Sequence, residues 1–264
     1  MHESAGNVAA RTLPVVADAG PDRPRDVDGA PAPAPLQRLE SIPDLPIARA
    51  WMCERLRAAR ISESTLSAFG ALPRHAFAPL RRWRVAYLDF DLWTGHTWMT
   101  APSVVARVID ALGPLRGRRV LEVGTGTGYQ AALLATLGAD VVSAEVSRHC
   151  VLTARYRLRM LGVERLRVVH SSGFAPELRP GEFDQIVVNC VLSAPPAVFI
   201  EAIPGWRGVL VAPFLSADGS QRLLRLERNP EERHRLSDLG PCRFSGGFKV
   251  PAGWGGHTVL NPPL

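Results

Sequence analysis

The chain has 264 residues, 46% of them hydrophobic, and a formal net charge of +6 at pH 7. This length and apolar content suit one α/β domain with an extension and are ample for a sizeable core. All the basic side chains except Lys249 are arginine, so the charge reflects a compositional bias. Because no basic run is interleaved with aromatic residues, we expect no nucleic-acid partner.

The N-terminal residues 1–43 are rich in Ala, Pro, Asp and Arg and have no apolar periodicity, so we expect a disordered tail. The four cysteines are scattered, without a C-x-x-C pair or a His at zinc-ligand spacing. That pattern favours free thiols in a reducing compartment and no metal site. The chain has neither the order of a signal peptide nor a run of 18 apolar residues, so we expect a cytoplasmic protein with no membrane partner.

Residues 44–113 are expected to form an N-terminal helical region that includes an acceptor loop. Apolar residues at helical spacing predict a helix over 45–58, and Ser62 is placed to begin a second one. Residues 73–79 read as a turn and residues 86–101 as a loop-rich stretch. Pro102 favours the start of a third helix, which runs to about Leu112.

Strand and helix patterns alternate over residues 114–247, which we expect to form the main domain. Strands are predicted near 119–123, 141–145, 166–170, 184–189 and 207–213, with helices near 128–137, 148–161 and 195–203. A further strand is predicted over 220–227, and 242–244 is a candidate for another. This alternation indicates a Rossmann-like, mostly parallel, doubly wound sheet with helices on both faces. Residues 248–264 read as an irregular tail.

The segment 120–132, V-L-E-V-G-T-G-T-G-Y-Q-A-A, is the most informative motif. An apolar strand runs into three glycines at alternate positions, Gly124, Gly126 and Gly128, and a helix pattern follows at once. Such a turn lets a nucleotide-like ligand approach the backbone and the free N–H groups of the helix start. The alternative is a plain strand–turn–helix with a glycine-rich bend.

The acid Glu145 ends the second strand about 20 residues further on, which is the distance of a ribose-binding carboxylate. Its alternative is a solvated acid at a strand end. A dinucleotide fingerprint would need Gly or Ala at position 129, where this chain has Tyr129. The form Glu-x-Gly-x-Gly-x-Gly resembles motif I of the S-adenosylmethionine (SAM) methyltransferases instead. The resemblance implies SAM as cofactor, held by residues Glu122, Gly124, Thr125, Gly126, Gly128, Glu145, Ser172 and Gly173.

Over residues 47–247 the chain resembles the protein-L-isoaspartate (D-aspartate) O-methyltransferase family. The segment L-P-R-H-A-F-A-P at 72–79 is similar to its V-P-R-H-x-F-V-P element, and A-Y-L-D at 86–89 to its A-Y-x-D. Further matches lie at 95–106, 120–132, 219–223 and 239–244. The resemblance implies a carboxyl O-methyltransferase whose partner is a protein or peptide carrying isoaspartate or aspartate, as in protein repair.

The chain departs from the family pattern around the acceptor and adenine pockets. The loop before Pro102 reads as one residue short, so Gly95 matches only one of two glycines. Thr100 stands where the family has an active-site serine, and its extra methyl stiffens χ1. Residues 171–173, S-S-G, replace G-D-G, so Ser172 would accept the adenine hydrogen bond without a charge. The segment 189–193 also lacks the family's Thr-Ala-rich run.

Methyl transfer to a carboxylate needs little proton chemistry, because a carboxyl with a pKa of about 4 is already an anion at neutral pH. The protein must align the reacting atoms and exclude water. Thr100 is our candidate catalytic residue, whose hydroxyl would orient the acceptor carboxylate. The equally weighted alternative is that Thr100 caps the helix beginning at Pro102. Glu122 is expected to support the glycine loop or to contact the methionine amine of SAM through a water.

Several readings of function stay open from the sequence alone. A peptide-maturation carboxyl methyltransferase keeps the chemistry and changes the substrate. A SAM-binding protein without catalysis would keep Gly124, Gly126, Gly128 and Glu145. Nucleic-acid methylation is the weakest reading, because the N/D-P-P-Y signature of amino-methylating enzymes is absent after Asn189. The oligomeric state is not readable.

Overall fold

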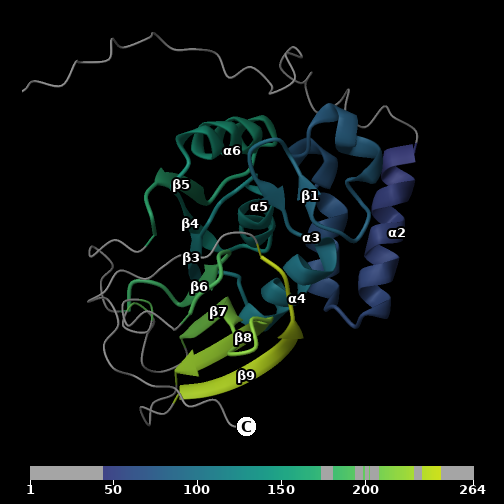
Figure 1. Cartoon of the computed structure of the whole chain (residues 1–264). Coiled ribbons are helices and arrows are strands. Elements are labelled where there is room, and N and C mark those ends of the chain that lie inside the picture. The colour runs from purple at the N-terminus through teal and green to yellow at the C-terminus, as the bar shows by residue number, and fades with distance from the viewer. Residues whose placement is uncertain are drawn as a thin grey trace, which may run out of the picture. The chain divides into compact units, whose positions relative to one another are not determined.

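The computed structural model describes residues 44–173, 181–193, 199, 202, 208–228 and 234–244, all within one compact unit, Pro33–Leu264. The tails expected at 1–43 and 248–264 lie outside these described residues, as does most of the helix expected at 195–203. The domain boundary expected near residue 113 stays a prediction. The described part is a central sheet with helices packed against it (Figure 1).

The described strands form a seven-stranded sheet in the order β5-β4-β3-β6-β7-β8-β9. In chain order the strands are β3 (Arg119–Val123), β4 (Asp140–Glu145), β5 (Leu166–His170), β6 (Gln185–Val188), β7 (Val209–Leu215), β8 (Gln221–Arg228) and β9 (His234–Pro241). The first five pair in parallel, and β8 and β9 add to the edge in antiparallel fashion. The expected mostly parallel α/β sheet is therefore confirmed.

Five helices are described, and their positions agree with the apolar periodicity of the sequence. They are α2 (Asp44–Ala58), α3 (Glu63–Ala71), α4 (Pro102–Leu112), α5 (Tyr129–Thr136) and α6 (Arg148–Met160). The Ser62 hydroxyl caps α3 by accepting a hydrogen bond from the Thr65 backbone N–H, as its residue type favours. Asp110 of α4 accepts from the Ser62 backbone N–H at 2.8 Å, which ties α3 to α4. Among the described residues, no helix combines the length and the apolar content needed to span a membrane.

Short elements fill the stretch between α3 and α4 that the sequence indicated as turn and loop. They are the 3₁₀-helices η1 (Arg74–Phe77) and η2 (Leu80–Val85) and the two-stranded hairpin of β1 (Leu92–Trp93) and β2 (Trp98–Met99). In Figure 1 the β1 strand of the hairpin lies beside α5. A side chain at Gly126 would meet Thr97, so the hairpin contacts the glycine loop directly.

Each face of the sheet has its own apolar core, because successive side chains of a strand point to opposite faces. On one face, Val120 of β3 packs in a cluster to which α2, α3, α4, α5 and α6 all contribute. On the other face, Leu121 and Ile186 pack in a cluster with Phe199 and Ala202, which are both helical. The expectation of helices on both faces is confirmed.

The chain reverses direction across the sheet between β3 and β6. From β3 it moves outward to β4 and β5, and it then returns to β6 on the other side of β3. In open α/β sheets, ligands bind in the crevice at the carboxyl ends of the strands at such a switch point. Here the residues at that position are Gly124, directly after β3, and Asn189, directly after β6.

The last strand differs from the sequence-based expectation. The candidate strand at 242–244 is not one; the strand is β9, which ends at Pro241. It pairs with β8 alone, at the edge of the sheet, and carries several charged and polar residues. An edge strand half exposed to solvent needs no apolar alternation, so the pattern that identified the inner strands is missing there.

Gly173, three residues past β5, occupies a position that admits no side chain. Its φ is +71°, and a Cβ there would approach Val123 Cγ2 at 2.8 Å and Ala144 Cβ at 3.1 Å. We expect Gly173→Ala to lower the free energy of unfolding by about 1–3 kcal/mol more than Gly117→Ala. Gly117 is a matched control, because it has a similar φ of +72° with nothing within 4 Å. Equal losses in urea unfolding would contradict the packing argument.

Candidate functional site

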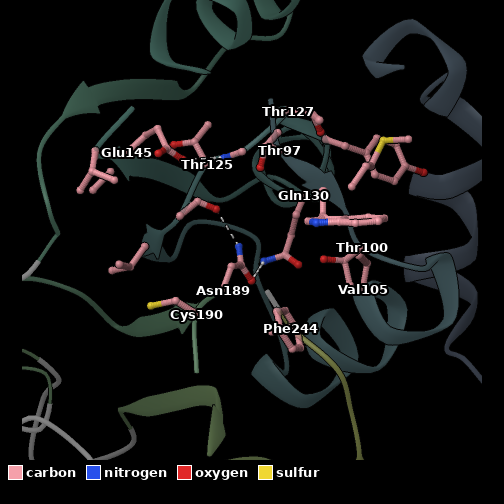
Figure 2. Close-up of a pocket in the computed structure, with 18 of the residues that line it drawn as sticks. Thr97, Thr100, Val105, Thr125, Thr127, Gln130, Glu145, Asn189, Cys190 and Phe244 are labelled. Atoms are coloured by element: carbon pink, nitrogen blue, oxygen red, sulfur yellow. Dashed lines mark hydrogen bonds between the residues drawn. The ribbon is translucent and has the colours of Figure 1, made fainter. Parts of the chain in front are cut away.

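A cavity of about 300 Å³ opens at the carboxyl ends of the parallel strands, at the switch point. Figure 2 shows Glu145 on one side of it, Thr100 on the other, and Gln130 and Asn189 between them. The nine predicted site residues divide into two groups. Those that line the cavity are Thr100, Gly124, Thr125, Gly126, Glu145 and Ser172; those that do not are Glu122, Gly128 and Gly173.

The glycine loop is shaped by backbone geometry that only glycine adopts readily. Gly124, Gly126 and Gly128 have φ values of +94°, +53° and +88°. A Cβ at Gly124 would meet the Cβ of Asn189 at 3.2 Å. Gly128 is the residue preceding α5, so the free N–H groups of that helix begin beside the loop. The N–H groups of the three glycines are bonded within the protein, to the Ala144 carbonyl, the Glu145 carboxylate and the Thr125 carbonyl. A ligand would therefore depend on the N–H groups of the first turn of α5 instead.

Glu145 is held by two backbone donors. Its Oε2 accepts from the Gly126 N–H at 2.9 Å, and its Oε1 accepts from the Ser147 N–H at 2.9 Å. The side chain is 9% exposed and lines the cavity. A carboxylate has about four lone-pair sites, so each oxygen keeps an acceptor position for a second donor. Two neighbouring hydroxyl groups are the kind of donor pair that this arrangement suits.

Glu122 lies outside the cavity lining and inside a buried hydrogen-bond network. Its Oε2 accepts from Ser143 Oγ of β4, and its Oε1 accepts from Asn189 Nδ2. Ser143 also bonds to Thr125 Oγ1, and Gln130 Nε2 donates to Asn189 Oδ1. Burial raises the pKa of Glu122 to about 8, against the opposing effect of its hydrogen bonds from Ser143 and Asn189.

Thr100 does not cap the helix that follows it. The residue preceding α4 is Ala101, which offers no side-chain hydrogen bond to the helix. Thr100 lines the cavity, at the side away from Glu145 (Figure 2). The structure therefore does not support the helix-cap role and places Thr100 where it could contact a ligand; the catalytic role stays a prediction.

Ser172 lines the cavity beyond Glu145, whereas Gly173 packs against the sheet. The Gly173 N–H donates to Ser171 Oγ at 3.2 Å, which closes the turn after β5. The segment S-S-G therefore contributes one side chain to the cavity and one glycine to the close approach of the backbone. A hydrogen bond from Ser172 to an adenine amine stays a prediction.

Two tryptophans lie at the rim. Trp98 lines the cavity and is 45% exposed, and Trp93 is 39% exposed with its ring centroid 5.2 Å from that of Trp98. They are surface residues and not core packing. His75, by contrast, is buried with its Nδ1 2.6 Å from the Tyr87 hydroxyl, and burial lowers its pKa to about 4. His75 is thus a structural residue away from the cavity.

Several lining residues were not among the predicted site residues, and three of them are informative. Asn189 and Gln130 line the cavity and join the network of Glu122, and Phe244 lines the cavity from beyond β9. Asn189 could have been found from the sequence, because it is a polar residue at the end of a buried strand next to the motif strand. No sequence pattern pointed to Phe244, because it lies near the cavity only as a result of how the C-terminal strands run.

Comparisons with known proteins identify one family. Residues 48–247 match the family described as Protein-L-isoaspartate(D-aspartate) O-methyltransferase (PCMT). The chain is 38% identical over 195 residues to the protein-L-isoaspartate O-methyltransferase of Stenotrophomonas maltophilia (strain R551-3), covering 73% of this chain and 85% of that protein. It is 41% identical over 204 residues to that of Methylorubrum populi, covering 75% and 93%.

A solved structure of the same description is also similar. It is a protein-L-isoaspartate O-methyltransferase with a TM-score of 0.67 and 25% identity, covering 76% of this chain and 66% of that one.

The raised pKa of Glu122 predicts a pH-dependent stability. Its folded pKa of about 8 exceeds its ordinary 4.5, so its contribution is present below pH 4.5 and lost as pH rises through 8. Relative to Glu122→Gln, the unfolding free energy of the natural protein should fall by up to about 1.4 kcal/mol per pH unit between pH 5 and 8.

Denaturant unfolding of both proteins across that range measures the effect. Taking the difference cancels His75, whose lowered pKa makes stability rise with pH near its own titration. Parallel stability curves for the two proteins would show that Glu122 is ionised in the folded state.

Proposed function

The chain belongs to the protein-L-isoaspartate(D-aspartate) O-methyltransferase family, and from this membership we propose that it methylates the free carboxylate of isoaspartyl residues in proteins or peptides, with SAM as the methyl donor. One observation carries the proposal. A carboxylate, Glu145, and a hydroxyl, Thr100, line one cavity on opposite sides of it (Figure 2). This is the arrangement that a donor and an acceptor require when they must meet in line.

The residues at the Glu145 side fit SAM. Glu145 keeps one acceptor position on each oxygen for the two ribose hydroxyls. Gly124 and Gly126 line the cavity without a Cβ, and the first N–H groups of α5 favour a carboxylate such as that of the methionine part. Ser172 would accept from the adenine amine. Bound SAM supplies a methyl group on a positively charged sulfur.

The residues on the Thr100 side of the cavity position the acceptor and exclude water. An isoaspartyl carboxylate is ionised at neutral pH, so no general base is needed. The Thr100 hydroxyl donates to one oxygen of that carboxylate and fixes its rotation. Trp98, Met99 and Phe244 form apolar walls that remove water from the reacting atoms. Alignment of this kind contributes up to about 7–11 kcal/mol to lowering a barrier.

Repair is the biological sense of this reaction. The methyl ester carries a better leaving group than the free carboxylate does. The neighbouring backbone nitrogen attacks the ester carbonyl, methanol leaves, and the succinimide so formed can be opened by water to normal aspartate. The partner is then a damaged protein or peptide.

A dedicated peptide is the second candidate, and the exposed Trp93–Trp98 pair favours it. Two adjacent indole rings at the rim form an apolar surface that suits a particular flanking residue. In this case the chemistry is the same and the substrate range is narrow.

An isoaspartyl test peptide with methyl-labelled SAM tests the proposal. We expect label in the isoaspartyl peptide and none in the matched aspartyl peptide. Transfer confined to a narrow set of flanking sequences would favour the dedicated-peptide reading. SAM binding without label in any peptide would contradict catalysis and leave a SAM-binding protein.

Glu145→Gln should weaken SAM binding by about 10- to 100-fold. An amide in that place keeps one oxygen and turns an NH₂ group toward a backbone donor, Gly126 or Ser147, so one N–H loses its partner. Calorimetric titration with SAM measures the change. Glu122→Gln is the matched control, since Glu122 is outside the cavity lining and a neutral amide resembles its protonated form. Equal affinities of the two variants would remove Glu145 from the SAM site.

A further inference from the structure

The peptide group that joins Thr100 to Ala101 is held at both ends by charged side chains. Arg74 Nη2 donates to the Thr100 carbonyl oxygen at 2.8 Å. Asp91 Oδ1 accepts from the Ala101 N–H at 2.8 Å. Because the C=O and N–H of a trans peptide point in opposite directions, the two side chains hold the group from opposite sides. Neither Arg74 nor Asp91 lines the cavity.

Arg74 is itself held by several contacts in the core. It is fully buried, its Nε donates to the Ala86 carbonyl at 2.7 Å, and its guanidinium lies 4.9 Å from the centre of the Tyr129 ring. Tyr129 packs edge-on against Phe69 and Phe77. Within the described residues Arg74 forms no ion pair; its Nε and Nη2 donate to backbone carbonyls, its guanidinium lies over an aromatic face, and its buried Nη1 has no hydrogen-bond partner. The Thr100 carbonyl is therefore tied to the core.

Asp91 provides a hydrogen-bond acceptor at the start of α4, where the side chain of Ala101 has none. Ala101 precedes α4 and has no side chain that can accept from the first N–H groups of the helix. The carboxylate of Asp91 takes that place from the loop before β1, and Asp89 accepts from the Ser103 N–H at 2.9 Å. Both acids lie at the helix N-terminus, where negative charge is favourable. Only Asp91 reaches the peptide group of Thr100.

We propose that Arg74 and Asp91 are positioning residues, which hold the Thr100–Ala101 peptide so that the Thr100 hydroxyl meets the acceptor carboxylate. This inference rests on the proposed function. The hydroxyl is separated from the held peptide by only the Cα–Cβ and Cβ–O bonds, so a shift of the peptide moves the hydroxyl nearly as far. A displacement of about 1 Å in a positioning group can lower turnover on the order of 100-fold.

The test uses Asp91, because an Arg74 substitution would disturb the core. We expect Asp91→Ala to lower kcat for an isoaspartyl peptide by about 10-fold or more, with SAM affinity unchanged. Asp91→Asn keeps an oxygen that can accept from Ala101 and should restore kcat to within about 2-fold. Asp89→Ala is the matched control: it removes the other acid at the same helix end without touching the Thr100 peptide.

A double-mutant cycle decides whether Asp91 acts through Thr100. Thr100→Val removes the hydroxyl, so Asp91→Ala should have no further effect on kcat in that background. The inference is overturned if Asp91→Ala leaves kcat within 2-fold, if Asp89→Ala lowers kcat equally, or if the Asp91 and Thr100 effects multiply. A natural protein that binds SAM and methylates no isoaspartyl peptide overturns the proposed function, and the inference with it.

Discussion

A buried carboxyl group, Glu122, holds the carboxyl ends of three neighbouring strands in one arrangement. It stands in β3, bonds to Ser143 of β4, and bonds to Asn189 directly after β6. Each polar atom in this network needs its partner, because an unpaired group in the interior costs about 1–3 kcal/mol. The network therefore couples the spacing of β4, β3 and β6 at the switch point to the glycine loop, since Ser143 also bonds to Thr125 of that loop. The same loop lines the cavity.

The two sides of the cavity are built by different means. The Glu145 side depends on backbone: positive φ values at the glycines, N–H groups at the start of α5, and a carboxylate fixed by Gly126 and Ser147. The Thr100 side lies on a loop and the first turn of α4, so its geometry comes from long-range side-chain contacts. A ligand common to many enzymes suits the first kind of site. A variable acceptor suits the second, because side chains can change without rebuilding the sheet.

The sequence predicted those parts of the fold that depend on interactions between residues close together in the chain. The strand, three glycines and helix of residues 120–137 follow from apolar periodicity and glycine spacing, and the cap at Ser62 follows from its residue type. The edge strand β9 was missed, because a strand with one neighbour and one wet face has no apolar alternation. The contacts of Arg74 and Asp91 with the Thr100 peptide could not be predicted, since they join residues up to 26 positions apart through loops without a periodic pattern. The departures from the family at Thr100 and Ser172 were visible in the sequence, but only the structure separates a helix cap from a cavity wall.

Glu122 and Arg74 are both buried and would both be charged in water, but only Arg74 has to keep its charge in the folded protein. Glu122 can lose its charge, and with a pKa raised to about 8 it is largely protonated at neutral pH. Arg74 keeps its charge: burial lowers the pKa of its guanidinium, but arginine stays protonated in proteins. The guanidinium donates to the carbonyl oxygens of Ala86 and Thr100 and lies over the face of Tyr129. The hydrogen-bond network of Glu122 is thus close to neutral, while the Thr100–Ala101 peptide lies between the positive charge of Arg74 and the negative charge of Asp91. Under the proposed function, the cationic donor would lie beside the carboxylate of Glu145, and the Thr100 hydroxyl would orient the anionic acceptor. Alignment by fixed residues is then the main demand that this reaction would place on the protein, because a carboxylate attacks a sulfonium without an acid or a base.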